Sequence, residues 1–207
     1  MKQQFKDELE DKILGISTTG RDDKSSDDTH SPYEATAYAV LDRIVEAGYI
    51  TECNTLVDFG CGKGRVPIYL SNKTGCRSVG VDMETRFIYI AEDNLRRIES
   101  LSDKLCMSEK ISFVNSMAED IEVSAEMDRF YFFNPFSYDI FKGVLSNISD
   151  SIYENPREVY LFFYYPSDEY MGRLMTEDQL MFVDEIECQD LFYSRDYREK
   201  VVIFEVV

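Results

Sequence analysis

A glycine-rich stretch carries the strongest chemical signal in this 207-residue chain. It reads VDFGCGKGR, with glycines at 60, 62 and 64, and it follows an apolar run typical of a buried strand. Gly60 permits a tight turn, Gly62 lets a ligand approach bare backbone, and the amides near Gly64 start a helix and face the ligand. A dinucleotide-binding loop would need a further glycine where this chain has Arg65, and Asp58 suits a cofactor with an ammonium group. The stretch therefore predicts cofactor binding and disfavours pyrophosphate.

Acidic residues follow the next two predicted strands. Asp82 lies 20 residues beyond Gly62, where a carboxylate can bind ribose hydroxyls. The third strand ends in NSMAED, a short polar loop in which the amide of Ala118 and the side chain of Glu119 can meet an adenine ring. Taken alone, Asp82 is equally well a turn residue, and residues 119–120 fit a solvated loop. Their order after the glycine stretch is what supports a binding site.

Aromatic and polar residues could wall a substrate site. The sequence FFNPF at 132–136 ends the fourth predicted strand, and its plain alternative is a strand end with a proline turn. His30 with Tyr33, and Tyr164 with Tyr165 after the fifth strand, lie where pockets form at sheet edges. His30 is the only histidine and could accept a proton from a charged amine, although a solvated loop histidine is the simpler interpretation. The tyrosines fit either an aromatic cage for an ammonium group or ordinary packing.

The elements that must position these residues can be predicted from periodicity. In residues 1–30 a short charged segment is followed by STTGRDDKSSDDTH, which has no period and is rich in Ser, Thr, Asp and Gly, so we expect a loop or lid before a single domain at 31–207. Ser31, Pro32 and Glu34 form a helix-start signature, and Gly48 supplies the left-handed stop. Between them runs an apolar stripe of Ala37, Val40, Leu41, Ile44 and Val45.

Short apolar runs then alternate with helical stretches, which is typical of βαβ units. Strands are expected over 55–59, 78–81, 111–114, 129–133 and 159–164. Runs at 180–186 and 201–206 have no helical pattern between them and predict an antiparallel hairpin. The fold expected is a doubly wound, mostly parallel α/β sheet with helices on both faces.

Composition limits the partners. With 22 basic against 40 acidic residues and a net charge of -18, the chain repels phosphate backbones, so nucleic acid is disfavoured. Arg96 and Arg97 are the nearest basic candidates, and they fit a solvated helix face.

No apolar run is long enough to span a membrane, and the start of the chain lacks the pattern of a secretory signal, which favours the cytoplasm. Five cysteines without a C-x-x-C pair suggest neither disulfides nor a metal site.

The order of these motifs resembles that of class I S-adenosylmethionine-dependent methyltransferases, over roughly residues 31 to 165. The resemblance implies a seven-stranded sheet whose last strand is antiparallel, with the cofactor at the carboxyl ends of strands one to three and the substrate over strands four and five. It implies S-adenosylmethionine as the cofactor, held by Asp58, Gly60, Cys61, Gly62, Gly64, Asp82, Met83, Ala118 and Glu119.

The sequence around Asn134 resembles, minus one proline, the Asn-Pro-Pro-aromatic motif of amino-group methyltransferases. In that family the asparagine and a proline carbonyl accept hydrogen bonds from the target nitrogen, and the aromatic ring packs on the substrate. The resemblance therefore implies Asn134, Pro135 and Phe136 as catalytic residues, and methylation of an amine or a protein side chain by direct in-line transfer. The alternative function is a cofactor-binding regulatory or scaffold protein that does not transfer the methyl group.

Overall fold

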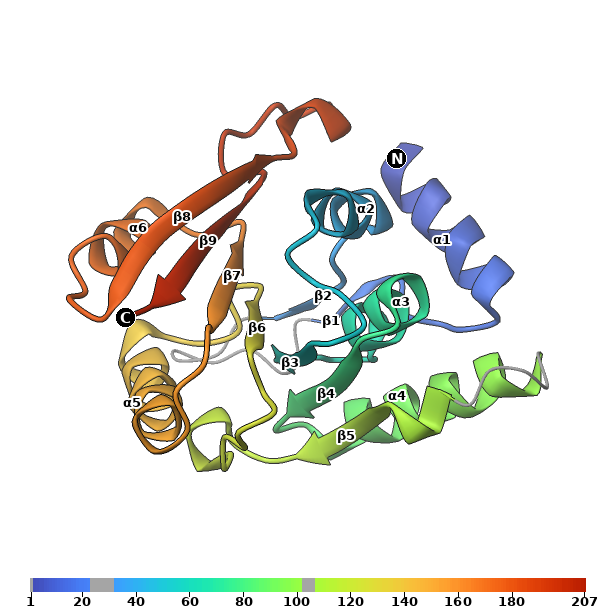
Figure 1. Cartoon of the computed structure of the whole chain (residues 1–207). Helices are drawn as coiled ribbons and strands as arrows, with labels where there is room; N and C mark the ends of the chain where they lie inside the picture. The colour runs from blue at the N-terminus through green and yellow to red at the C-terminus, as the bar shows by residue number, and fades with distance from the viewer. Residues whose placement is uncertain (1, 23–31, 102–106) are drawn as a thin grey trace.

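The molecule is built on one seven-stranded sheet with the order β5-β4-β3-β6-β7-β9-β8 (Figure 1). The computed structural model describes residues 2–22, 32–101 and 107–207. Neighbouring strands are parallel except at β9, which is antiparallel to both β7 and β8. The predicted mostly parallel sheet and its antiparallel hairpin are confirmed. The strands are β3 (Thr55–Phe59), β4 (Arg77–Asp82), β5 (Ile111–Asn115), β6 (Arg129–Phe132), β7 (Tyr160–Tyr164), β8 (Leu180–Glu187) and β9 (Lys200–Val206).

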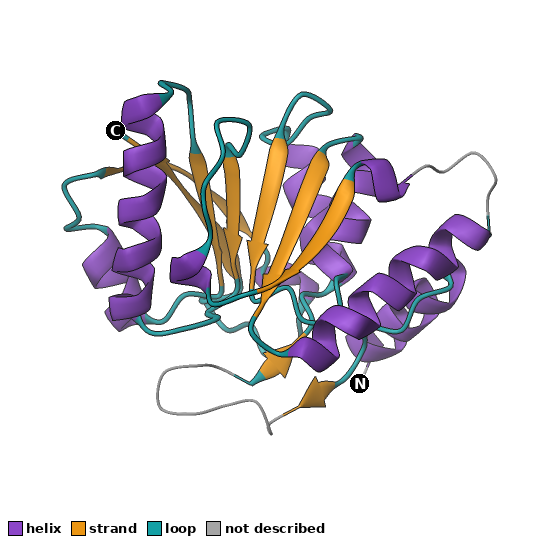
Figure 2. Ribbon diagram, turned by 90° about the horizontal axis from the view of Figure 1, so that it is seen from below, coloured by secondary structure: helices purple, strands orange, loops and turns teal. Residues whose placement is uncertain are grey.

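Helices cover both faces of the sheet, as Figure 2 shows. On one face, α2 (Tyr38–Ala47), α3 (Arg65–Thr74) and α4 (Thr85–Ser100) pack against the strands, and on the other lie α5 (Tyr138–Glu154) and α6 (Asp168–Leu174). Side chains alternate across each strand, so that Leu56 packs with α2 and α3 whereas Val57 packs with α5. Because both faces are covered, β3 is buried along its whole length. Short 3-10 turns lie at η2 (Met107–Glu109), η3 (Ala118–Asp120) and η4 (Gln189–Leu191).

The predicted helix start at residues 31–34 is wrong. Tyr33–Glu34 form a short strand, β2, that pairs with β1 (Arg21–Asp22), and α2 begins only at Tyr38, after Ala37. Tertiary contacts override the local capping signal here, because Tyr33 is buried against the glycine loop and its backbone pairs with β1. The predicted end of the helix is confirmed, since Gly48 has a φ of 78°.

The N-terminal segment is not a plain loop. Residues Lys2–Leu14 form a helix, α1, and the chain then returns along the domain to β1 (Figure 1). The periodicity of α1 is hidden because its buried face carries Asp7 and Asp11 instead of apolar side chains. Residues 23–30, the rest of the predicted lid, lie outside the described residues, and the boundary at residue 30 stays a prediction.

Three further observations concern the length and polarity of the helices, two surface arginines and the cysteines. Every helix in the described ranges is too short or too polar to cross a bilayer. Arg96 and Arg97 lie exposed on α4 and pair with Glu92 and Asp93, so they belong to a solvated helix face. The four cysteines that the structure describes, at 53, 61, 76 and 188, are free thiols.

We predict that Gly64→Ala destabilises the fold by about 2–4 kcal/mol. Gly64 has a φ of 82°, and a Cβ there would lie 2.7 Å from the Phe113 ring and 2.9 Å from the Ala91 Cβ. The control is Gly172→Ala in α6, where a Cβ meets nothing within 4 Å and higher helix propensity stabilises by about 0.5–1 kcal/mol. Urea unfolding of both variants measures the difference, and equal stabilities would contradict the prediction.

Candidate active site

A pocket opens at the carboxyl ends of β3, β4, β5 and β6, where a doubly wound sheet places its ligands. We call it the strand-end pocket, and it holds about 920 Å³ of empty space, part of it continuous with solvent. It is lined by Pro32, Tyr33, Glu34, Ala35, Thr36, Asp58, Gly60, Cys61, Arg65, Val66, Val81, Asp82, Met83, Glu84, Phe87, Ser116, Met117, Ala118, Glu119, Tyr131, Phe133, Pro135 and Phe136.

The glycine loop after β3 is held by backbone hydrogen bonds to the next strand. The amides of Gly60 and Cys61 both donate to the carbonyl of Val81, at 2.8 and 3.0 Å, and both residues line the strand-end pocket. Gly62 has a φ of 51° and lies beneath the ring of Tyr33, so its missing side chain makes room for a protein ring. The lack of a side chain at Gly64 likewise serves packing.

Two buried carboxylates stand at the bottom of the strand-end pocket. Asp58 is only 3% exposed, and its carboxylate has no hydrogen bond to any described residue. Burial, with the neighbouring charge of Asp82, raises the pKa of Asp58 well above its ordinary value. Asp82 accepts hydrogen bonds at 2.8 Å from the amides of Gly62 and Glu84, one on each oxygen. These bonds lower its pKa, but burial outweighs them and the pKa is raised.

A third carboxylate comes from η3, after β5. The Oε2 of Glu119 is buried and has no hydrogen-bond partner among the described residues. The backbone there is fixed because the side-chain amide of Asn147 donates to the Glu119 carbonyl at 2.7 Å. Ala118 precedes it, and Met83, 39% exposed, follows Asp82 on the same rim. The structure thus brings three incompletely bonded carboxylates, predicted one by one, into one pocket.

The sequence after β6 divides between two pockets. Pro135 and Phe136 line the strand-end pocket, and a Cβ on Gly60 would lie 2.7 Å from that of Pro135. Asn134 turns away with a φ of 42°, and its side-chain nitrogen donates to the carbonyl of Tyr165 at 2.5 Å. That bond leaves the Oδ1 of Asn134 without a partner among the described residues, as an acceptor at the border of the second pocket.

The second pocket lies next to the first and shares part of its wall. We call it the tyrosine pocket, and the two have Pro32, Glu34, Ala35, Arg65 and Phe133 in common. Its other lining residues are Gln3, Gln4, Asp7, Thr19, Gly20, Arg21, Ala37, Asn134, Tyr164, Tyr165, Phe192 and Glu199. Of the four predicted substrate residues, the structure brings Tyr164 and Tyr165 here and Tyr33 into the strand-end pocket, whereas His30 lies outside the described residues.

Both tyrosines of this pocket already have partners for their hydroxyl groups. The hydroxyl of Tyr164 donates to Glu199 at 2.6 Å, and that of Tyr165 donates to Asp196 at 2.7 Å. Burial and the Asp196 carboxylate raise the pKa of Tyr165 to about 12. Arg198 lies over the Tyr165 ring at 4.6 Å from its centroid. Both tyrosines therefore stay neutral and act as walls.

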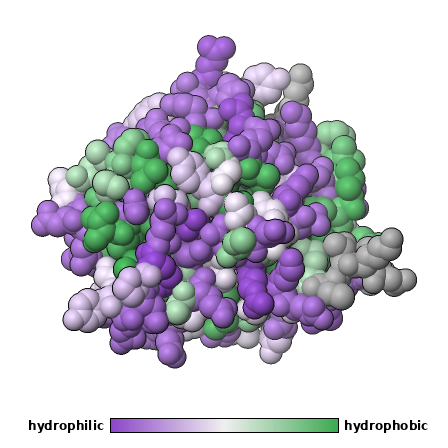
Figure 3. All heavy atoms as spheres, in the orientation of Figure 1, coloured by the Kyte–Doolittle hydropathy of each residue, from purple (hydrophilic) through white to green (hydrophobic). Residues whose placement is uncertain are grey.

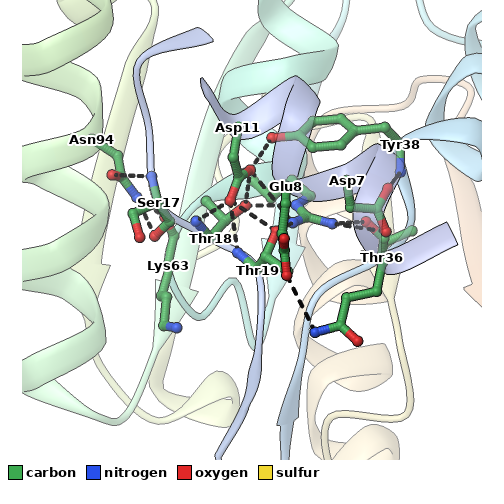
Figure 4. Close-up of polar contacts among 12 residues, drawn as sticks. Asp7, Glu8, Asp11, Ser17, Thr18, Thr19, Thr36, Tyr38, Lys63 and Asn94 are labelled. Carbon is green, nitrogen blue, oxygen red and sulfur yellow. Dashed lines mark hydrogen bonds and ion pairs between the residues drawn. The ribbon is translucent and has the colours of Figure 1, made fainter. Parts of the chain in front are cut away.

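Arg65 has a structural role that the sequence did not reveal. This residue is 3% exposed, and its guanidinium donates to the Thr18 hydroxyl at 2.6 Å and to the Thr36 carbonyl at 2.9 Å. It also pairs with Asp11 at 3.4 Å and with Asp7 at 3.8 Å, both on α1. Figure 4 shows these α1 carboxylates and the threonines converging on one point. The four-residue spacing of the two aspartates, which puts them on one helix face, is the signal that could have revealed the network.

The two aspartates of the network differ electrostatically. Burial raises the pKa of Asp7 in spite of the Arg65 charge. Burial acts the same way on Asp11, but hydrogen bonds from Tyr38 and Thr18 and the charge of Arg65 together hold its pKa below the ordinary value. Asp11 is therefore a firmly ionised partner of the guanidinium.

Several solved structures resemble this fold. An RNA methyltransferase from Salinibacter ruber, solved with S-adenosyl-L-homocysteine, matches with a TM-score of 0.52 and 19% identity over 83% of this chain and 93% of its own. A SAM-dependent methyltransferase from Aquifex aeolicus matches with a TM-score of 0.57 and 15% identity, covering 80% and 89% of the two chains. A protein of the NADB-Rossmann superfamily from Streptococcus agalactiae gives a TM-score of 0.58 and 12% identity, covering 83% and 69%.

No protein-family model and no curated protein sequence matches the chain significantly. The identities to the solved structures are low, so the likeness concerns the fold. The chain has the Rossmann-like α/β fold of class I S-adenosylmethionine-dependent methyltransferases.

We predict that Arg65→Ala lowers the free energy of unfolding by about 3–5 kcal/mol, because it leaves two buried carboxylates without their cation. Loss of that cation raises the folded-state pKa of Asp7 and Asp11, so the deficit appears as the pH rises through those values and shrinks in acid. Urea unfolding at several pH values measures it. The matched control is Arg96→Ala, 64% exposed, which should change stability by less than about 1 kcal/mol. A pH-independent loss would contradict this account.

Proposed function

We propose that this protein is an S-adenosylmethionine-dependent methyltransferase that acts on a nitrogen atom. The observation that carries the proposal is the set of three carboxylates, Asp58, Asp82 and Glu119, that reach the strand-end pocket from three successive strands. Buried carboxylates without full hydrogen bonding are costly unless a ligand completes them. Their number and order suit a cofactor with an ammonium group, two ribose hydroxyls and an adenine amino group.

The residues present fit that cofactor. Asp58, without a partner, would hold the ammonium group, and Asp82, whose oxygens each retain a free lone pair, would accept from the ribose hydroxyls. The orphan Oε2 of Glu119 would accept from the adenine amino group, with the Ala118 amide beside it. When bound, S-adenosylmethionine supplies a methyl group on a positively charged sulfur.

The acceptor would enter through the tyrosine pocket. There the free Oδ1 of Asn134 can accept a hydrogen bond from an amine and orient its lone pair, while Phe133 lies between the two pockets. Aligning the acceptor and excluding water are the main contributions of the protein to a direct transfer. The half-buried Glu199 borders the same space, and burial raises its pKa, so it could receive the proton of a charged amine.

The net charge of the chain limits the class of acceptor. A net charge of -18 disfavours nucleic acid, so the RNA named for one structural neighbour is not carried over to this chain. An amine metabolite or a protein side chain is the acceptor that we propose. Free thiols at all four described cysteines fit a reducing compartment such as the cytoplasm.

Isothermal titration with S-adenosylmethionine and S-adenosylhomocysteine tests the cofactor, with NADH as the control ligand. We expect both sulfur compounds to bind at micromolar concentration and NADH not to bind. Asp82→Ala should weaken binding about ten- to hundredfold, because charge-assisted hydrogen bonds are worth about 1.5–3 kcal/mol. Asp120→Ala, an exposed carboxylate in the same turn as Glu119, is the matched control. Equal affinity of the Asp82 variant would remove that residue from the site.

Asn134→Gly tests the acceptor side. Glycine tolerates the φ of 42° at this position, so the variant removes the amide group without straining the backbone. We expect methyl transfer to amines or proteins, followed with a labelled methyl donor, to fall by about a hundredfold or more while cofactor affinity stays unchanged. Asn155→Gly, at the exposed end of α5, is the control. Undiminished turnover would exclude Asn134 from the reaction.

A further inference from the structure

Helix α1 turns charged side chains toward the domain and apolar side chains toward solvent. Phe5, Leu9 and Ile13 lie four residues apart on one face and are 67%, 49% and 63% exposed. Asp7 and Asp11, on the opposite face, are 7% and 5% exposed and bind Arg65. A surface helix ordinarily turns its apolar stripe inward and its charges toward water. In α1 the charged face packs against the domain instead.

The outward direction of the stripe is fixed by the structure. The Arg65 network holds the polar face of α1 against the domain, so the helix cannot roll over to bury its apolar side. Hydrophobic side chains gather along the right-hand edge of the molecule in Figure 3, where α1 lies in Figure 1. No described residue covers them, and an exposed contiguous stripe of this kind marks an interaction surface.

The charges beside the stripe favour a second copy of this chain as the partner. With 100° per residue, Lys6 and Glu10 flank the stripe on one side, and Glu8 and Lys12 flank it on the other. Lys6, Glu8 and Lys12 are exposed and Glu10 is partly exposed, and neither lysine forms an ion pair with another described residue. In an antiparallel pair of α1 helices centred on Leu9, Phe5 faces Ile13 of the second copy.

The same arrangement matches the charges. Lys6 then lies beside Glu10 of the second copy, and Lys12 lies beside Glu8 of the second copy. A twofold axis makes each contact occur twice, as an isologous interface requires. We propose that α1 is a dimerisation helix that pairs antiparallel with α1 of a second copy through Phe5, Leu9 and Ile13.

The interface would lie one helix thickness from the site. The opposite face of α1 holds Arg65, which lines both pockets, and Gln3 and Asp7 of α1 line the tyrosine pocket. Covering the outer face would therefore favour the docked position of α1 on which the pocket walls depend. The pairing itself does not rest on the proposed methyl transfer.

Sedimentation velocity of the full chain, from low micromolar to millimolar concentration, tests the pairing. We expect a concentration-dependent dimer, and Leu9→Glu should raise its dissociation constant by about a hundredfold or more by placing like charges at the axis. Circular dichroism and urea unfolding verify that the variant is folded. Tyr153→Glu is the control, because this side chain is 88% exposed on α5, away from α1. A monomer at all concentrations, or a dimer unaffected by Leu9→Glu, would overturn the proposal.

A charge exchange separates self-pairing from binding of another partner. Lys6→Glu alone should weaken the dimer, and Lys6→Glu combined with Glu10→Lys should restore it, because each copy then offers the matching charge to the other. No rescue in the double variant would argue against the antiparallel pair. Cosedimentation of a strictly monomeric protein with phosphatidylcholine vesicles would overturn it in favour of a lipid surface.

Discussion

The structure depends on the buried guanidinium of Arg65. This group occupies the first position of α3, directly after the glycine loop, and binds both carboxylates of α1 and the backbone before α2. A buried cation must be compensated, so the segments that supply its partners are obliged to stay together. Three stretches far apart in the sequence thereby become one wall of the pocket. The residue that replaces the last glycine of a dinucleotide loop thus has a structural task of its own.

In the strand-end pocket, unlike in the Arg65 network, the charged groups lack full hydrogen bonding. Asp58 and Asp82 are buried, as is one oxygen of Glu119, and these carboxylates have few donors around them, whereas Arg65 and its partners are almost fully satisfied. The protein concentrates its unmet hydrogen-bonding capacity in one place and satisfies its polar groups next to it. Such a division is expected of a binding site, because a ligand then gains the interactions that folding leaves incomplete.

The sheet and part of the candidate site could be predicted from sequence, because strand periodicity, glycine spacing and acidic residues after strands are local signals. The conformation of the segment that leads into α2 could not be predicted. The capping signal at Pro32 is local, but the burial of Tyr33 on Gly62 and its pairing with β1 are contacts between distant segments that override it. The inverted polarity of α1 likewise defeats a search for apolar periodicity. The motif singled out Asn134 as a candidate, whereas its placement in a different pocket from Pro135 follows from a backbone conformation that sequence does not reveal.

The position of β9 in the sheet has a consequence for synthesis of the chain. β9 is made after β8 yet lies between β7 and β8, so one edge of β7 and the whole of β8 have no strand to pair with until residues 200–206 leave the ribosome. β7 carries the sequence YLFFY, which is apolar and aromatic on both faces. An open strand edge of this composition invites pairing with other chains. The nascent protein is therefore open to aggregation during the interval in which β7 has been made and β9 has not.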